Sequence, residues 1–161
     1  MRIRIVVADR GEARFYDTDH IHSPLRLAGQ LTDPQAHLHD RDFKSDRPGR
    51  VFDHAAAPAG RRGAVAHHGT GSERTPLKHE AEVFAHHIAR ELESALQVHA
   101  FDRLVLMAEP AFLGLLRQVL PKSLMSRVVA QVHKDLVHQD ELAVLGHVPP
   151  EVFSSLQAGG V

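Results

Sequence analysis

Short apolar runs separated by polar turns fill the first third of the chain, a pattern typical of β-strands. Residues 3–8 and 13–16 predict two strands, and the polar turn Asp9-Arg10-Gly11-Glu12 between them predicts a hairpin. A third strand is predicted over residues 25–31. Asp33-Pro34 then places an N-cap residue before a proline, which predicts the start of a short helix.

The second half of the chain changes to apolar residues three and four apart between Leu77 and Leu96, which places them on one face of a long helix. Residues 101–108 follow as a predicted strand whose continuous apolar run favours a central position in a sheet. The remaining pattern predicts a helix from Pro110 to about Leu120, a strand over 128–133, and a short helix over 140–145 closed by Gly146.

Strands that first form a hairpin and then alternate with helices predict an α/β fold, with a mixed sheet and helices packed on its faces. A chain of 161 residues is the usual size of one domain. We expect that domain to cover residues 1–148 and to be followed by a loose tail over 149–161.

Glycine and proline interrupt the pattern between residues 44 and 76, which predicts a long loop. Long loops in compact domains often carry function. We expect residues 44–53 to be ordered, because Val51 and Phe52 can anchor them, and residues 55–74 to be mobile.

The composition excludes several classes of protein. Nineteen Lys and Arg residues against 20 Asp and Glu residues give a net charge of −1, so any contact with nucleic acid must be local. The absence of cysteine excludes disulfides and thiolate metal sites and fits a reducing cytoplasm. The apolar run at the N-terminus is too short for a signal peptide, and we expect no membrane insertion.

Histidine is abundant, with 14 residues, and this raises the question of a metal site. His79, Glu82 and His86 stand three and four apart on the polar face of the long helix, so they could converge on a divalent ion. The same spacing is typical of a solvated helix face. We expect no metal and no other cofactor.

Two aspartates follow predicted strands. Asp9 ends the first strand and Asp135 lies just past the last, and paired carboxylates can hold magnesium for phosphodiester chemistry. Asp9 is equally a natural first residue of the hairpin turn, and Asp135 can simply end a strand. No nucleophile elbow, dinucleotide fingerprint or phosphate loop occurs, so the sequence holds no complete catalytic motif.

Cationic side chains surround the Pro48-Gly49 turn of the long loop and can present charged donors to phosphate or carboxylate groups. The alternative is a polar turn in which neighbouring aspartates neutralise the cations. The predicted ligand-binding residues are Lys44, Asp46, Arg47, Arg50, Lys134 and Asp135.

Four segments of the chain resemble the bacterial family of host attachment proteins, or proteins required for attachment to host cells. They are Lys44-Ser45-Asp46-Arg47-Pro48-Gly49-Arg50-Val51-Phe52-Asp53, Val7-Ala8-Asp9-Arg10, Phe101-Asp102-Arg103-Leu104-Val105-Leu106 with Pro110-Ala111-Phe112-Leu113-Gly114, and Val132-His133-Lys134-Asp135-Leu136. The resemblance covers residues 3–148, and the Asp46-Arg47-Pro48-Gly49-Arg50 loop is its most specific part.

The resemblance implies a fold similar to the central domain of archaeal and eukaryotic peptide-chain release factors, itself reminiscent of ribonuclease H. The Gly-Gly-Gln tripeptide of release factors is missing, because Gly159-Gly160 precedes Val161 and Ala28-Gly29-Gln30 lies in a predicted strand. We therefore expect a non-catalytic cytoplasmic protein that binds an unidentified protein partner and acts indirectly in attachment to host cells. The alternative is a release-factor-like protein associated with the ribosome or RNA, including a metal-dependent nuclease.

Overall fold

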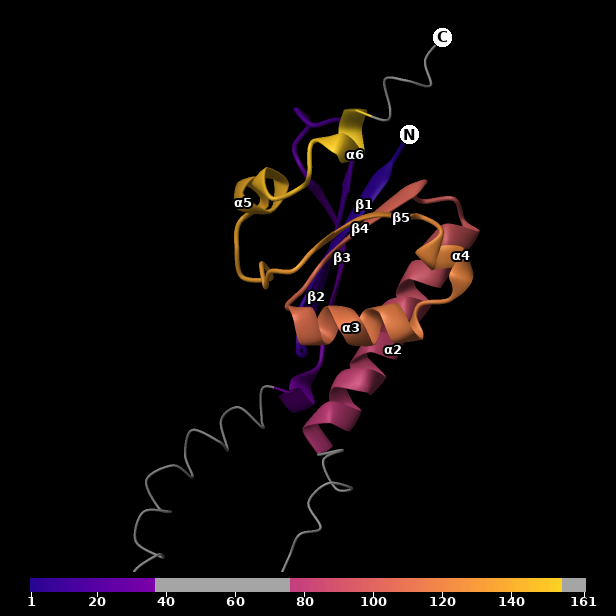
Figure 1. Cartoon of the computed structure of the whole chain (residues 1–161), viewed down its shortest axis with the longest axis vertical. Coiled ribbons are helices and arrows are strands. Elements are labelled where there is room, and N and C mark those ends of the chain that lie inside the picture. The colour runs from indigo at the N-terminus through magenta and orange to yellow at the C-terminus, as the bar shows by residue number, and fades with distance from the viewer. Residues whose placement is uncertain (37–75, 155–161) are drawn as a thin grey trace, which may run out of the picture.

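The computed structural model describes residues 1–36 and 76–154, which form a five-stranded mixed sheet with helices on both faces (Figure 1). The strand order is β3-β2-β1-β4-β5. This arrangement confirms the predicted α/β class. The strands are β1 (Ile3–Ala8), β2 (Glu12–Thr18), β3 (Arg26–Thr32), β4 (Arg103–Met107) and β5 (Val128–Val132).

Strand β1 lies in the middle of the sheet. It pairs antiparallel with β2 and parallel with β4, and β5 continues the parallel part. All six residues of β1 are buried. Strand β4 lies beside β1 and pairs with β5 on its other side, and four of its five residues are buried, as expected of the covered interior strand predicted within residues 101–108.

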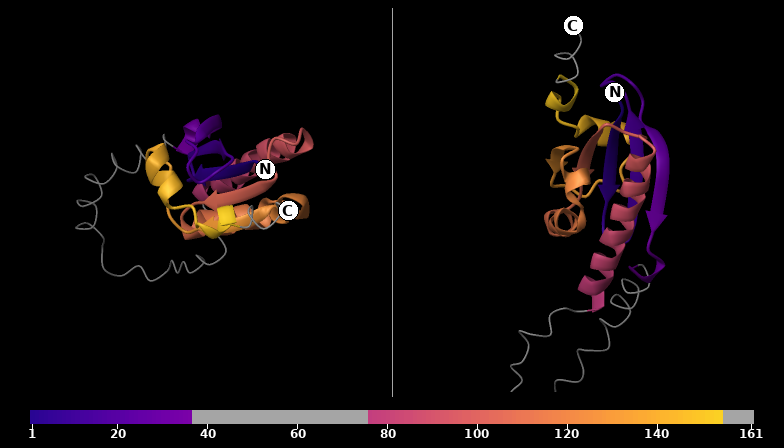
Figure 2. Two further views of the ribbon diagram at one scale, coloured as in Figure 1. Left: turned by 90° about the horizontal axis from the view of Figure 1, so that it is seen from above. Right: turned by 90° about the vertical axis from the view of Figure 1, so that its right-hand side faces the viewer.

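The helices cover both faces of the sheet. Residues 34–36 are helical, and the backbone N–H of Gln35 donates to Asp33 Oδ1 at 3.0 Å, as expected of the predicted N-cap. Figure 2 shows α2 running along the sheet. The other helices are α2 (Pro76–Gln97), α3 (Pro110–Val119), α4 (Lys122–Met125), α5 (Glu141–Gly146) and α6 (Glu151–Ser154).

The sheet separates two hydrophobic cores, because successive residues of a strand point to opposite faces. Val6 and Ala8 of β1 pack toward α2, α3 and α4, with α2 contributing Phe84, Ile88 and Leu92. Ile3, Ile5 and Val7 pack on the other face against the C-terminal segment, which contributes Leu136, Val137, Val144, Val152 and Phe153. Both faces of the sheet are therefore covered.

The C-terminal segment differs from the sequence prediction in two places. Residues 149–154 are not loose, because Pro149 and Pro150 lead into α6 and the buried Val152 and Phe153 cover the second core. Gly146 is not the residue that follows the C-cap of α5, as the sequence predicted. It is the last residue of that helix, and the C-cap is His147, whose backbone is in the right-handed helical region.

No helix in residues 1–36 or 76–154 is long and apolar enough to cross a membrane.

A buried ion pair ties β1 to β2 on the α2 side of the sheet. Arg4 Nε and Nη2 each donate to an oxygen of the Asp17 carboxylate at 2.8 Å. The guanidinium also lies over the ring of Phe101, 5.3 Å from its centroid. Only 7% of Arg4 is exposed, so these two partners take the place of water in stabilising the buried guanidinium.

A second polar network lies near the hairpin turn. Glu12 Oε1 accepts hydrogen bonds from Arg14 Nε at 2.8 Å and from Gln30 Nε2 at 2.9 Å, which links β2 to β3. The hydrogen bonds of Arg14 to the Tyr16 side chain and to Glu12 raise the pKa of Arg14 above its ordinary value. Arg14 therefore stays a cation.

We expect Asp17→Ala to lower the free energy of unfolding by about 2–3 kcal/mol, because it leaves the buried Arg4 guanidinium without its carboxylate. Urea denaturation followed by circular dichroism measures this change. Asp19→Ala is the matched control, since Asp19 forms a solvent-exposed ion pair with Arg26 at 3.5 Å and should change stability by less than about 1 kcal/mol. Equal losses in the two variants would contradict a special role for the Arg4–Asp17 pair.

Candidate functional site

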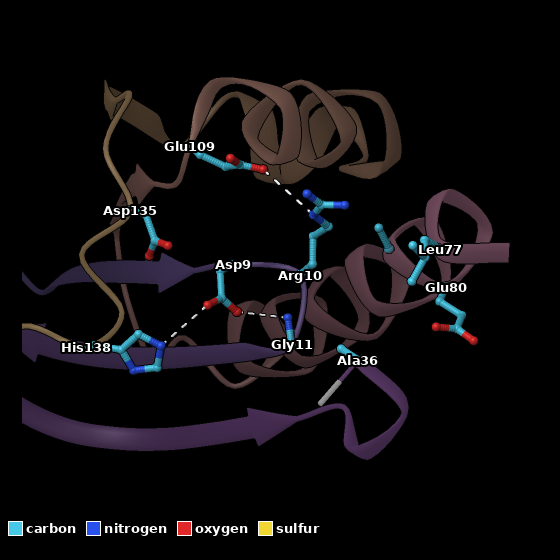
Figure 3. Close-up of a pocket in the computed structure, with 10 residues that line it drawn as sticks. Asp9, Arg10, Gly11, Ala36, Leu77, Glu80, Glu109, Asp135 and His138 are labelled. Carbon is cyan, nitrogen blue, oxygen red and sulfur yellow. Dashed lines mark hydrogen bonds and ion pairs between the residues drawn. The ribbon is translucent and has the colours of Figure 1, made fainter. Parts of the chain in front are cut away.

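A pocket of about 470 Å³ lies at one edge of the sheet, where the three parallel strands end (Figure 3). Asp9 follows β1, Glu109 follows β4, and Asp135 follows β5. The first turns of α2 close the side of the pocket. Its lining residues are Asp9, Arg10, Gly11, Ala36, Leu77, Glu80, Ala81, Glu109, Asp135 and His138.

Asp9 is held in place by the hairpin turn. Its Oδ1 accepts hydrogen bonds from the backbone N–H groups of Gly11 at 2.8 Å and of Glu12 at 2.7 Å. The backbone N–H of Asp9 donates to the Glu12 carbonyl at 2.9 Å, so the turn is closed from both sides. The sequence interpretation of Asp9 as a turn residue is therefore confirmed, and Oδ2 is left to face the pocket.

One long ion pair and one long contact between a histidine and a carboxylate lie in the pocket (Figure 3). Arg10 Nε lies 3.9 Å from Glu109 Oε1, and His138 Nε2 lies 3.8 Å from Asp9 Oδ2. The side chains of Arg10 and His138 are 61% and 68% exposed. Exposed pairs of this kind contribute about 0.2–1 kcal/mol each. A ligand can therefore displace Arg10 or His138 at little cost.

Among the described residues that line the pocket, acidic side chains outnumber basic ones. Asp9, Glu80, Glu109 and Asp135 line it, against Arg10 and His138. Asp135 is oriented by its own loop, since its Oδ1 accepts a hydrogen bond from the backbone N–H of Val137 at 3.2 Å. The excess of carboxylates favours ligands that present cationic groups.

The described part of the chain contains no group of three or more His, Asp or Glu side chains that could hold a metal ion. His79, Glu82 and His86 on α2 therefore do not form the ligand set that their spacing suggested. His79 and His86 are exposed and Glu82 is half-buried, which fits the solvated helix face that we considered as the alternative. Asp9 and Asp135 line one pocket, but among the described residues they belong to no group of three side chains placed to hold a metal ion.

The structure brings together some of the residues predicted from the sequence. Asp9 and Asp135 line the same pocket, whereas the exposed Lys134, although next in sequence to Asp135, does not line it. Lys44, Asp46, Arg47 and Arg50 lie outside the described residues. The segment that contains them is joined to the described fold at Ala36 and Pro76. Ala36 lines the pocket, and so does Leu77, which follows Pro76.

Sequence reasoning missed four polar residues of the pocket: Arg10, Glu80, Glu109 and His138. A positional signal existed for Glu109, because it directly follows an apolar strand, as Asp9 does. Glu80 and His138 had no such signal, since their place depends on how α2 and the C-terminal segment pack on the sheet.

Comparison with known proteins places the chain in a family. A family model described as "Protein required for attachment to host cells" matches residues 4–148. The chain therefore belongs to the family of proteins required for attachment to host cells. None of the curated proteins compared with the chain matches it.

Solved structures resemble the chain at low sequence identity. The archaeal translation termination factor aRF1 matches with a TM-score of 0.50 and 12% identity, over 98% of this chain and 38% of that chain. A structure described as an archaeal protein matches with a TM-score of 0.46 and 9% identity, over 98% of this chain and 39% of that chain. The chain thus spans about two fifths of the length of these structures, and the likeness to aRF1 concerns the fold alone.

We expect Asp9→Asn to leave the free energy of unfolding within about 0.5 kcal/mol of the wild-type value, because an amide oxygen can still accept both hydrogen bonds of the turn. Asp9→Ala removes this acceptor and should cost about 1–2 kcal/mol. Urea denaturation of the two variants measures the difference. If Asp9→Asn destabilises as much as Asp9→Ala, the charge of Asp9 rather than its hydrogen bonds supports the hairpin.

Proposed function

We propose that this protein is a non-catalytic binding protein that acts in the cytoplasm and influences attachment to host cells indirectly. Membership of the host attachment family supports the link to attachment. The binding role rests on the pocket at the ends of β1, β4 and β5. The cytoplasmic location rests on the sequence, which holds no cysteine.

The position of the pocket is the observation that carries the proposal. In open α/β sheets, ligands bind beyond the carboxyl ends of the strands, at the point where the strand order reverses. Here the chain runs from β1 outward to β2 and β3 and then crosses to β4 on the other side of β1. The reversal lies between β1 and β4, whose ends supply Asp9 and Glu109 to the pocket.

We propose that the cations predicted in the long loop also take part in binding. Lys44, Arg47 and Arg50 belong to the segment that is joined to the described fold at this pocket. Lys134, exposed beside Asp135, extends the proposed contact surface.

The alternative function is association with the ribosome or RNA. The fold likeness to aRF1 supports it, and the shared position of Asp9 and Asp135 is the observation behind its nuclease form. The excess of carboxylates at the pocket disfavours contact with phosphates. We therefore rank a protein partner first.

Capture of partners from lysate of the protein's own host at low salt tests the proposal. We expect the wild-type chain to retain a discrete protein partner. The double variant Arg47→Glu with Arg50→Glu should fail to retain this partner. The double variant Asp9→Asn with Asp135→Asn should bind it at least fivefold more weakly than wild type. Arg90→Glu with Lys122→Glu is the control, because it makes the same change in charge at two exposed residues that line none of the observed pockets.

Two results would contradict the proposal. A partner retained equally by the wild type and both site variants would place binding elsewhere on the surface. Ribosomal proteins or RNA that are recovered by the wild type, lost in the variants and released by moderate salt would favour the alternative function.

A further inference from the structure

An apolar groove continues from the pocket into the space between α2 and α3. Its volume is about 540 Å³, and it shares Arg10, Leu77, Ala81 and Glu109 with the pocket. The residues that belong to the groove alone are Lys78, Pro110, Ala111, Phe112, Gly114, Leu115 and Gln118. The two cavities therefore form one surface, apolar at one end and acidic at the other.

Gly114 is unfavourable for the stability of its helix. It lies in the middle of α3 (Pro110–Val119), where glycine is less favourable than alanine by about 1 kcal/mol. Its backbone is not in the left-handed region, and a Cβ added to it would meet no described atom within 4 Å. Neither backbone conformation nor packing within the described residues therefore requires a glycine at this position.

The location of Gly114 suggests a reason for having no side chain at this position. Gly114 lines the groove, one turn from Pro110 and Ala111 and next to Leu115. A larger side chain at this position would project into the groove and fill it. The glycine thus keeps open an apolar space that the described residues do not fill.

We propose that this groove receives a segment of a partner protein that carries an apolar side chain and, within about one helical turn, a Lys or Arg side chain. The apolar side chain would pack on Leu77, Ala81 and Leu115. The basic side chain would enter the acidic pocket beside Asp9, Glu109 and Asp135, where it would displace Arg10 from Glu109 and His138 from Asp9.

Charge complementarity selects this partner over others. The acidic end of the surface repels phosphates and acidic peptides. The groove is lined mostly by apolar side chains, and its polar ones are Lys78 and Gln118 besides the shared Arg10 and Glu109. This inference rests on the proposed function, since it names the partner chemistry of the same site.

Selection from a displayed library of random 12-residue peptides on the immobilised full-length protein tests the inference. We expect the enriched peptides to place an apolar residue within four positions of Lys or Arg. A synthesised enriched peptide should bind Gly114→Leu at least tenfold more weakly than wild type, and replacing its basic residue by Gln should also weaken binding at least fivefold.

Gly146→Leu is the matched control. Gly146 is also helical, and a Cβ there would likewise meet nothing within 4 Å, but it lies outside the groove. It should bind the peptide within twofold of wild type. Gly114→Leu should remain folded by circular dichroism, because leucine favours helices over glycine, and Gly114→Ala should give an intermediate loss of binding that confirms the steric cause.

Thiol labelling identifies other occupants of the groove. The chain has no cysteine, so Gly114→Cys and Gly146→Cys each carry a single thiol. We expect both variants to react with iodoacetamide at similar rates, and the selected peptide to slow only Gly114→Cys. Slow labelling of Gly114→Cys without peptide would overturn the inference. If labelling becomes faster on dilution, a second copy of the chain covers the groove. If dilution has no effect, residues of the same chain cover it.

Other outcomes separate this inference from the proposed function. Enriched peptides that are acidic, or that bind Gly114→Leu as tightly as wild type, would overturn the groove. If binding of the partner from lysate still requires Arg47 and Arg50 in that case, the proposed function stands and only the role of the groove is rejected.

Discussion

The structure depends on the burial of β1. All six of its residues are excluded from water, so each backbone N–H and C=O group must find a partner within the sheet. β2 provides these partners on one side and β4 on the other. The alternating side chains of β1 then enter two separate cores, and this requires helices on both faces of the sheet.

The same constraint locates the candidate site. Because β4 and β5 run parallel to β1, their carboxyl ends meet at one edge, while the antiparallel β2 returns the chain through a hairpin turn at that edge. Polar residues that end strands or form turns therefore gather there without entering either core.

Gly114 shows how a small local cost can indicate function. Natural sequences tend to satisfy helix propensity, packing and burial together, and departures from this agreement concentrate at functional positions. A glycine inside α3 that borders open space is such a departure. Gly114 lines an apolar groove that continues into the acidic pocket, and this combination of surfaces is better suited to a protein segment than to a nucleic acid.

The sequence by itself determined the five strands, α2 and α3 to within two residues, because burial on one or both faces imposes a period that the apolar residues display. It also indicated Asp9 and Asp135, since each follows a strand. The tertiary structure alone decided that these two share a pocket with Glu109 and His138, because strand order and parallel pairing bring together residues far apart in the chain. Only the tertiary structure showed that Val152 and Phe153 cover the second core, because a two-residue apolar pair is too short to show a period.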